Sequence, residues 1–291
     1  MRALLPPAAM VLACTCWAFG TVGIKALVDD LASTEIAFLR FAASALVLWL
    51  IVALTGRLKR VRGAGRAPFI MGICEPFLVS MLLIGGMAYS SATHAVVLWA
   101  ISPTVAPVMG RVFLGERIGV TIWIGAALAL TGAFVLVGGN TLGATSLIGD
   151  AMFILSVFVS CLNQVLGRKV ATGGGDPMVT SAMQITVAMV LALVAMPAIG
   201  GSPLPAMTPG IFVLVISLGV FANGLPFVLY NYALRTVPVA RMGLFLPMVA
   251  PIGTLLAAVW LAEPVTGNAL AALALMLTGA FLPQVTQRRT R

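Results

Sequence analysis

The chain has 291 residues, of which 61% are hydrophobic and only 9% charged, and its formal net charge is +9. A water-soluble domain carries about 25% charged residues, so this composition excludes an ordinary soluble protein. It indicates a protein whose surface faces lipid, where apolar atoms are in contact with the solvent they prefer.

The apolar residues fall into runs that are each long enough to cross a membrane, which takes a helix of roughly 20 residues. The first run exceeds the core of a signal peptide, so we expect it to stay as a helix. The predicted helices cover residues 6–28, 34–55, 67–87, 93–114, 119–137, 146–168, 176–199, 208–233, 238–261 and 266–283. The predicted fold is an all-α membrane protein of ten transmembrane helices joined by short loops.

Basic residues mark one side of these predicted helices. If the N-terminus is cytoplasmic, the loops on its side carry the basic run at residues 57–66, and the opposite loops carry no Lys or Arg. Because cytoplasmic loops favour Lys and Arg, we expect both termini inside, in a bacterial inner membrane. The basic run is thus a topology signal, and no nucleic-acid partner is expected; attraction to anionic lipid headgroups is a natural further effect.

The second half of the sequence repeats features of the first half. The pattern Leu-Thr-Gly-Ala-Phe occurs at residues 130–134 and 277–281, and Pro76, Pro103, Pro107 and Glu116 match Pro226, Pro247, Pro251 and Glu263 in the same order. The matches predict two five-helix repeats within one membrane domain, residues 1–142 and 143–291. An odd number of helices per repeat gives the halves opposite orientations, and inverted repeats recur among transporters.

Signatures of an enzyme are missing from the sequence. It has one histidine, His94, with no paired-histidine zinc motif and no glycine-rich phosphate loop, so we expect no catalytic residue, metal or cofactor. The cysteines lie inside apolar runs without a CxxC spacing, and we interpret them as small core residues: Cys14, Cys16, Cys74 and Cys161.

Glu75, in the third predicted helix, is the most informative single residue. A carboxyl group inside a membrane is costly when charged and is a functional candidate by default. It can bind a substrate amine or a proton. Alternatively, its carboxyl group can have the structural role of hydrogen-bonding the backbone where Pro76 interrupts the helix.

Other aromatic and polar side chains lie within the predicted spans and suit a binding cavity, although each can instead pack or join helices. Together with Glu75, the predicted substrate-binding residues are Trp17, Trp99, Ser102, Asn163, Gln164, Asn223 and Tyr230. Lys25 and Arg40 lie near helix ends, where we favour pairing with rim acids such as Asp29 and Glu35 over a carboxylate-binding role.

Prolines within the spans remove backbone hydrogen bonds and can kink a helix, which suits gating as well as simple shaping of the bundle. The predicted gating or kink residues are Pro76, Pro103, Pro107, Pro226, Pro247 and Pro251.

Several motifs follow one another in a characteristic order: Trp17 followed by Lys25, then Arg40-Phe41, then Pro103 to Gly115-Glu116-Arg117, and the Leu-Thr-Gly-Ala-Phe pattern in helices 5 and 10. In this order the chain resembles the EamA-type exporters of the drug/metabolite transporter superfamily, and among them the YddG-type amino-acid exporters. The resemblance implies a ten-helix bundle in which helices 1–4 and 6–9 surround a central cavity.

The expected function is that of a secondary transporter, an exporter or facilitator of small metabolites, with amino acids favoured, working by alternating access. The expected partners are the small-molecule substrate and the lipid bilayer, with the chain a monomer or a homodimer. Alternatives are a multidrug or quaternary-amine exporter, whose aromatic rings would bind a cation, and, from another class, a membrane-embedded enzyme or a scaffold.

Overall fold

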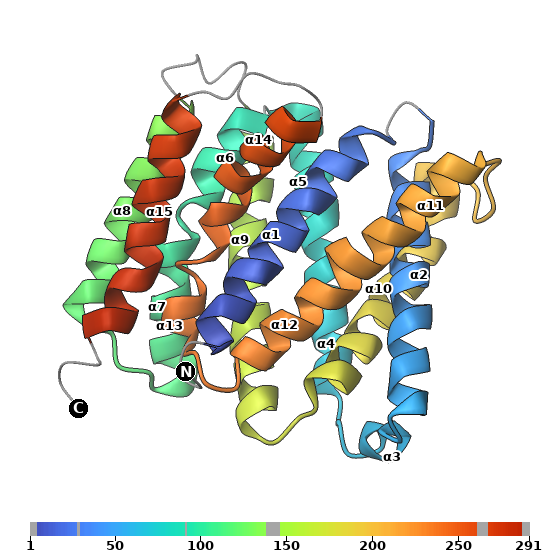
Figure 1. Ribbon diagram of the computed structural model, residues 1–291, viewed down its shortest axis with the longest axis horizontal. Coiled ribbons are helices and arrows are strands. Elements are labelled where there is room, and N and C mark those ends of the chain that lie inside the picture. Colours follow the sequence, from blue (N-terminus) through green and yellow to red (C-terminus); the bar gives the residue numbers. More distant parts are fainter. Residues whose placement is uncertain (1–4, 28–29, 91, 138–145, 261–266, 287–291) are drawn as a thin grey trace. The chain divides into compact units, whose positions relative to one another are not determined.

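The computed structural model describes residues 5–27, 30–90, 92–137, 146–260 and 267–286, and within these ranges all regular structure is helical (Figure 1). Two residues named above, Asp29 and Glu263, lie outside the described part of the chain. So do the side chains of Lys25 and His94.

Helix boundaries lie close to the predicted ones. The helices are α1 (Leu5–Lys25), α2 (Ser33–Leu54), α3 (Leu58–Val61), α4 (Ala67–Gly72), η2 (Ile73–Leu78), α5 (Val79–Tyr89), α6 (Ala92–Trp99), α7 (Ser102–Leu114), α8 (Val120–Val137), α9 (Leu147–Thr172), α10 (Pro177–Ile199), α11 (Pro209–Ser217), η3 (Leu218–Gly224), α12 (Leu225–Ala233), α13 (Val239–Met242), η4 (Leu246–Met248), α14 (Val249–Trp260) and α15 (Gly267–Thr286).

The helices have the length and composition of membrane spans. Among the described residues, nine stretches are long and apolar enough to cross a bilayer, and a further apolar helix, Gly267–Pro283, is shorter. Large apolar side chains such as Leu54 and Val112 are 78% and 69% exposed, as suits a surface that faces lipid. The chain is therefore a multi-pass helical membrane protein, whereas the count of ten spans stays a prediction.

Four of the spans are interrupted, in each case close to a predicted proline. The third span leaves helical geometry at Glu75, with φ −145° and ψ 122°, just before Pro76. The fourth breaks between α6 and α7 ahead of Pro103, the eighth passes through the π-helical η3 before Pro226, and the ninth changes to a 3-10 turn at Pro247. Pro107 and Pro251 lie inside α7 and α14, where the helix runs on.

The chain forms two compact units that do not coincide with the two halves of the sequence. Unit 1 draws on Met1–Phe77 and Lys169–Thr236, and unit 2 on Leu78–Arg168 and Val237–Arg291. Each unit therefore combines helices from both predicted repeats. The boundary predicted near residue 142 concerns the repeat in the sequence and stays a prediction.

Unit 1 is held by the packing of α2 against α10 and of α1 against η3 and α12. Phe41 and Leu48 of α2 share a buried cluster with Ile185 of α10. A β-carbon added to Gly20 of α1 would lie 2.8 Å from the β-carbon of Ala222, so these helices approach closely because the residue between them is glycine.

Unit 2 contains the long contact between α8 and α15, which lie side by side in Figure 1. A β-carbon on Gly125 would lie 2.6 Å from the carbonyl oxygen of Gly279, and one on Gly279 would lie 2.7 Å from that of Gly125. The backbones are thus in direct contact at this crossing. Within lipid the hydrophobic effect does not drive helices together, because the lipid is as apolar as the helix surface. Close packing of paired small residues supplies van der Waals contacts that hold the helices together instead.

We expect Gly125→Ala to lower the stability of the protein by about 1–3 kcal/mol, because the added methyl group forces the two backbones apart. Thermal unfolding in detergent measures this effect. Gly267→Ala is the matched control, since a β-carbon on Gly267 of α15 has no atom within 4 Å and can only add helix propensity. Equal melting temperatures for the two variants would contradict the close crossing.

Candidate functional site

An aromatic cluster joins α1 and α12 in unit 1. Trp17 meets Phe227 and Tyr230 edge to face, with ring centroids 5.7 and 5.8 Å apart, and the centroids of Phe227 and Tyr230 are 6.5 Å apart. Phe227 and Tyr230 are buried, whereas Trp17 is only partly buried. A rigid aromatic group of this kind can form the wall of a site that takes an apolar side chain or a cation.

A chain of amide hydrogen bonds links α12, α10 and the interrupted third span. Asn231 Nδ2 donates to Ser181 Oγ at 2.9 Å and to Gln184 Oε1 at 3.2 Å. Gln184 Nε2 in turn donates to the backbone carbonyl of Glu75 at 2.6 Å. All three side chains are buried, so the chain supplies a hydrogen bond to a backbone carbonyl at the interruption of the third span, where lipid offers none.

The break at Glu75 lies against α10 because Gly72 precedes it. A β-carbon on Gly72 would collide with the carbonyl oxygen of Gln184 and lie 2.7 Å from Cβ of Val187. Glycine at this position therefore lets the third span approach α10 closely enough for Gln184 to reach the carbonyl of Glu75. The side chain of Glu75 itself is half-buried, and its role as a site residue stays a prediction.

Several buried polar atoms of unit 1 have no hydrogen-bond partner in the described part of the chain. We name them the unpaired polar set: Arg40 Nε and Ser44 Oγ on α2, Asn223 Nδ2 on η3, and Asn231 Oδ1 on α12. Buried polar atoms are almost always bonded to protein or to ordered water, and exceptions call for an explanation. A polar ligand or water that enters between these helices would provide the missing partners.

Arg40 and Ser44 are brought to η3 by two glycines. A β-carbon on Gly219 would lie 2.8 Å from the carbonyl oxygen of Arg40, and one on Gly224 would lie 3.0 Å from Ser44 Oγ. Asn223 lies on the π-helical segment between these glycines and is buried. Single-turn π segments inside α-helices occur frequently at functional sites.

Glu35 does not provide the partner that was expected for Arg40. Its carboxylate accepts hydrogen bonds from the backbone N–H of Ala32 at 2.8 Å and from that of Ser202 at 2.7 Å. These bonds hold the start of α2 to the loop after α10. Arg40 is left with a buried Nε, and its predicted pairing with Glu35 is not what the structure shows.

The remaining predicted residues lie in unit 2. Trp99 Nε1 donates to Ser156 Oγ at 2.9 Å, and Ser156 Oγ donates to the carbonyl of Phe153 at 2.6 Å, so the indole is held in a structural bond. Ser102 is buried at the start of α7, while Asn163 and Gln164 are buried on α9.

The predicted site residues thus divide between the units. Trp17, Glu75, Asn223 and Tyr230 belong to unit 1, and Trp99, Ser102, Asn163 and Gln164 belong to unit 2. Sequence reasoning missed Gln184, Asn231, Ser181 and Ser44, although an amide within a span, such as Gln184 or Asn231, is a signal that could have found two of them. Within the described residues no group of three His, Cys, Asp or Glu side chains could hold a metal ion.

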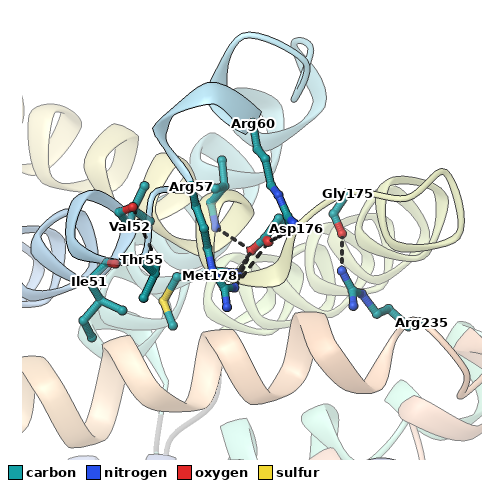
Figure 2. A network of polar contacts seen from close by, with 10 residues as sticks. Ile51, Val52, Thr55, Arg57, Arg60, Gly175, Asp176, Met178 and Arg235 are labelled. Atoms are coloured by element: carbon teal, nitrogen blue, oxygen red, sulfur yellow. Dashed lines mark hydrogen bonds and ion pairs between the residues drawn. The ribbon is translucent and has the colours of Figure 1, made fainter.

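A second polar network lies at one end of unit 1, around Asp176 (Figure 2). Arg57 Nη1 is 3.2 Å from Asp176 Oδ1, and Arg60 pairs with the other carboxylate oxygen. Oδ1 also caps α10 by accepting from the backbone N–H of Met178 at 3.0 Å and of Val179 at 3.4 Å. The network fastens the basic loop after α2 to the first turn of α10.

The electrostatics of this network favour the charged carboxylate. Burial alone would raise the pKa of Asp176, but the hydrogen bonds from Arg60 and the α10 backbone, together with the charge of Arg57, lower it below its ordinary value. Arg235 Nη2 extends the network by donating to the carbonyl of Gly175 at 2.9 Å, which ties the end of α12 to the same turn.

Two stretches of the chain, residues 6–138 and 147–283, match the sequence model described as the EamA-like transporter family. An "Uncharacterized transporter" of Archaeoglobus fulgidus is 24% identical over 94% of this chain and 96% of its own length. A "Probable terminal-alkyne amino-acid exporter" of Streptantibioticus cattleyicolor is 27% identical over 94% and 91%. A solved crystal structure with 18% identity shares the fold, with a TM-score of 0.83 over 100% of this chain and 99% of that one.

We expect Asp176→Asn to lower stability at pH 7 by about 1 kcal/mol, because Asn still caps α10 but cannot pair with Arg57 and Arg60. Since folding lowers the pKa of Asp176, its stabilising effect is complete above the unfolded pKa of about 3.9 and is lost as the pH falls through the folded value. Thermal unfolding of wild type and variant should therefore converge in strong acid. Asp30→Asn, which removes an exposed carboxylate from the same unit, is the control, and a difference that persists in acid would contradict the ion-pair account.

Proposed function

Because this chain belongs to the EamA-like transporter family, and is thus a transporter and not an enzyme, we propose that it moves amino acids across the membrane by alternating access. It would act as an exporter or facilitator in a bacterial inner membrane with both termini in the cytoplasm. The likeness to a protein named as an amino-acid exporter supports this substrate class.

The observation that carries the proposal is the buried Nε atom of Arg40, a residue that is partly exposed as a whole. Removing a charged group from water is costly unless a counter-charge and hydrogen bonds compensate it, and charged residues within spans commonly face a substrate path. Within the described residues Arg40 Nε has no hydrogen-bond partner, and neither Ser44 Oγ on α2 nor Asn223 Nδ2 on η3 has one. Two donors and a hydroxyl in this position suit a carboxylate, which accepts several hydrogen bonds.

The other predicted residues of unit 1 supply the rest of the site in this proposal. Glu75 would attract the amino group of the substrate, and Trp17 with Tyr230 would form an apolar wall for its side chain. Trp99, Ser102, Asn163 and Gln164 of unit 2 remain proposed substrate contacts, although the indole N–H of Trp99 is already bonded to Ser156.

The proposed mechanism uses ten spans in two inverted five-helix repeats, residues 1–142 and 143–291. The family model matches once in each half, which supports the repeat. Irregular helix at corresponding places supports it too. The segment η2 includes Pro76 and η3 precedes Pro226, while Pro103 and Pro247 both lie at helix breaks. These prolines, with Pro107 and Pro251, are the proposed gating positions, and the chain would act as a monomer or homodimer.

The second candidate function is export of drugs or quaternary amines. The edge-to-face cluster of Trp17, Phe227 and Tyr230 favours it, since aromatic rings bind such cations. The guanidinium of Arg40 in the same unit disfavours it, because a cationic substrate would be repelled. The two candidates therefore differ in whether the substrate needs a carboxylate.

We expect Arg40→Gln to reduce the uptake of a labelled amino-acid panel into proteoliposomes by at least about tenfold, because the substrate carboxylate loses its charged partner. Arg40→Lys should retain part of the activity, because the lysine ammonium keeps the positive charge but lacks the planar guanidinium that bonds a carboxylate through two donors. Arg62→Gln, which removes an exposed arginine from the loop after α2, is the control for general charge effects. Uptake is compared at equal amounts of folded protein in the vesicles.

A measurement on the unaltered protein covers the case in which Arg40→Gln does not fold. Wild-type uptake of labelled amino acids should be blocked by excess amino acid and not by the corresponding amino-acid amide, which lacks the carboxylate. Competition by the amide as strong as that by the acid, or normal uptake by folded Arg40→Gln, would contradict the carboxylate site. Transport of quaternary amines alone would favour the second candidate.

A further inference from the structure

A cleft of about 320 Å³ lies within unit 2, at the end where α7 stops and α8 and α13 start. Its volume is within the range of small-molecule sites. The lining includes three arginines and one carboxylate, Arg117, Arg168, Arg241 and Glu116, together with Thr121 and Pro283. None of these residues belongs to the proposed substrate site.

The carboxylate of Glu116 is already engaged in the fold. It accepts hydrogen bonds from the backbone N–H of Val239 at 3.1 Å and of Ala240 at 3.2 Å, and Arg168 Nε lies 3.6 Å from it. Glu116 thus joins the turn after α7 to the start of α13. Because three arginines and a single carboxylate line the cleft, its net charge is positive.

The end of α7 is built to hold Glu116 in this position. Gly115 ends the helix in left-handed geometry, φ 67°, with its N–H bonded to the carbonyl of Arg111. A β-carbon on Gly110 would lie 2.8 Å from Glu116 Oε2, so glycine there makes room for the carboxylate. Arg117 follows directly and adds its guanidinium to the cleft.

We propose that this cleft binds the phosphate group of an anionic phospholipid. Arginine matches phosphate because its planar fork donates two parallel hydrogen bonds, and basic pockets between transmembrane helices bind lipid headgroups. The candidate spans Ala95–Leu114, Val120–Val137 and Val239–Trp260 all begin or end at the cleft, which puts it at headgroup depth.

The apolar surroundings favour a lipid over a free phosphate ion. Val120, Trp123 and Ile124, in the first turns of α8, are 75%, 43% and 46% exposed, and their neighbours Thr121 and Ile122 line the cleft. Acyl chains attached to the bound headgroup would cover these apolar side chains. Tryptophan at this depth is typical of the boundary between lipid and water.

The test is native mass spectrometry of the purified full-length protein with phosphatidylglycerol or with phosphatidylcholine of the same acyl chains. Wild type should retain phosphatidylglycerol preferentially. Arg117→Gln should weaken this retention roughly fivefold, the effect of one arginine near an anionic headgroup, and Arg241→Gln should weaken it similarly. Arg117 is exposed, so its replacement leaves the packing of unit 2 unchanged.

Arg111→Gln is the matched control, because Arg111 lies exposed in the last turn of α7 but does not line the cleft. Equal weakening by Arg111→Gln, or no weakening by Arg117→Gln, would overturn the site. Binding of inorganic phosphate without retention of phosphatidylglycerol would assign the cleft to a free ion and overturn the lipid as its source. Retention of phosphatidylcholine as strong as that of phosphatidylglycerol would overturn the proposed preference for an anionic phospholipid.

Discussion

The hydrogen bond from Gln184 Nε2 to the carbonyl of Glu75 is the interaction on which the rest of unit 1 depends. A backbone that leaves helical geometry inside a membrane must find partners within the protein, because lipid offers none. Gln184 supplies one, Asn231 fixes the amide of Gln184 from α12, and Gly72 gives the interrupted span access to α10. The break that carries Glu75 is thus stabilised by two helices that are distant in sequence, α10 and α12.

Small residues determine where each unit is tightly packed and where it can take a ligand. In unit 2, Gly125 and Gly279 bring α8 and α15 into backbone contact. In unit 1, Gly219 and Gly224 do the same for η3 and α2, but the polar atoms that meet there are not all satisfied. A contact that is close yet leaves buried donors unbonded is costly unless a ligand or water completes it, which is how we interpret the α2–η3 contact.

The sequence predicts the spans well, because an apolar run bounded by charges and glycines has few alternatives to a helix: the predicted 34–55 is found as Ser33–Leu54. Prolines at 76, 103, 226 and 247 also coincide with helix irregularities, since each removes a backbone donor. The partners of polar groups were beyond prediction. Arg40 and Glu35 are close in sequence, yet Glu35 bonds the backbone of Ser202, and the pairing of Asp176 with Arg57 and Arg60 depends on packing between distant segments.

The central claim is that the unpaired polar set of unit 1 opens to water and takes the substrate. The direct measurement is the reaction of a charged methanethiosulfonate with Asn223→Cys in membranes, after the native cysteines are replaced. Asn223 is 4% exposed, and Phe221 on the same π-helical segment is 53% exposed on an apolar surface. The account predicts that Asn223→Cys reacts, more slowly when transported amino acid is present, and that Phe221→Cys does not react because a thiolate does not form in lipid. An unreactive Asn223→Cys, or one that amino acids do not protect, would contradict it.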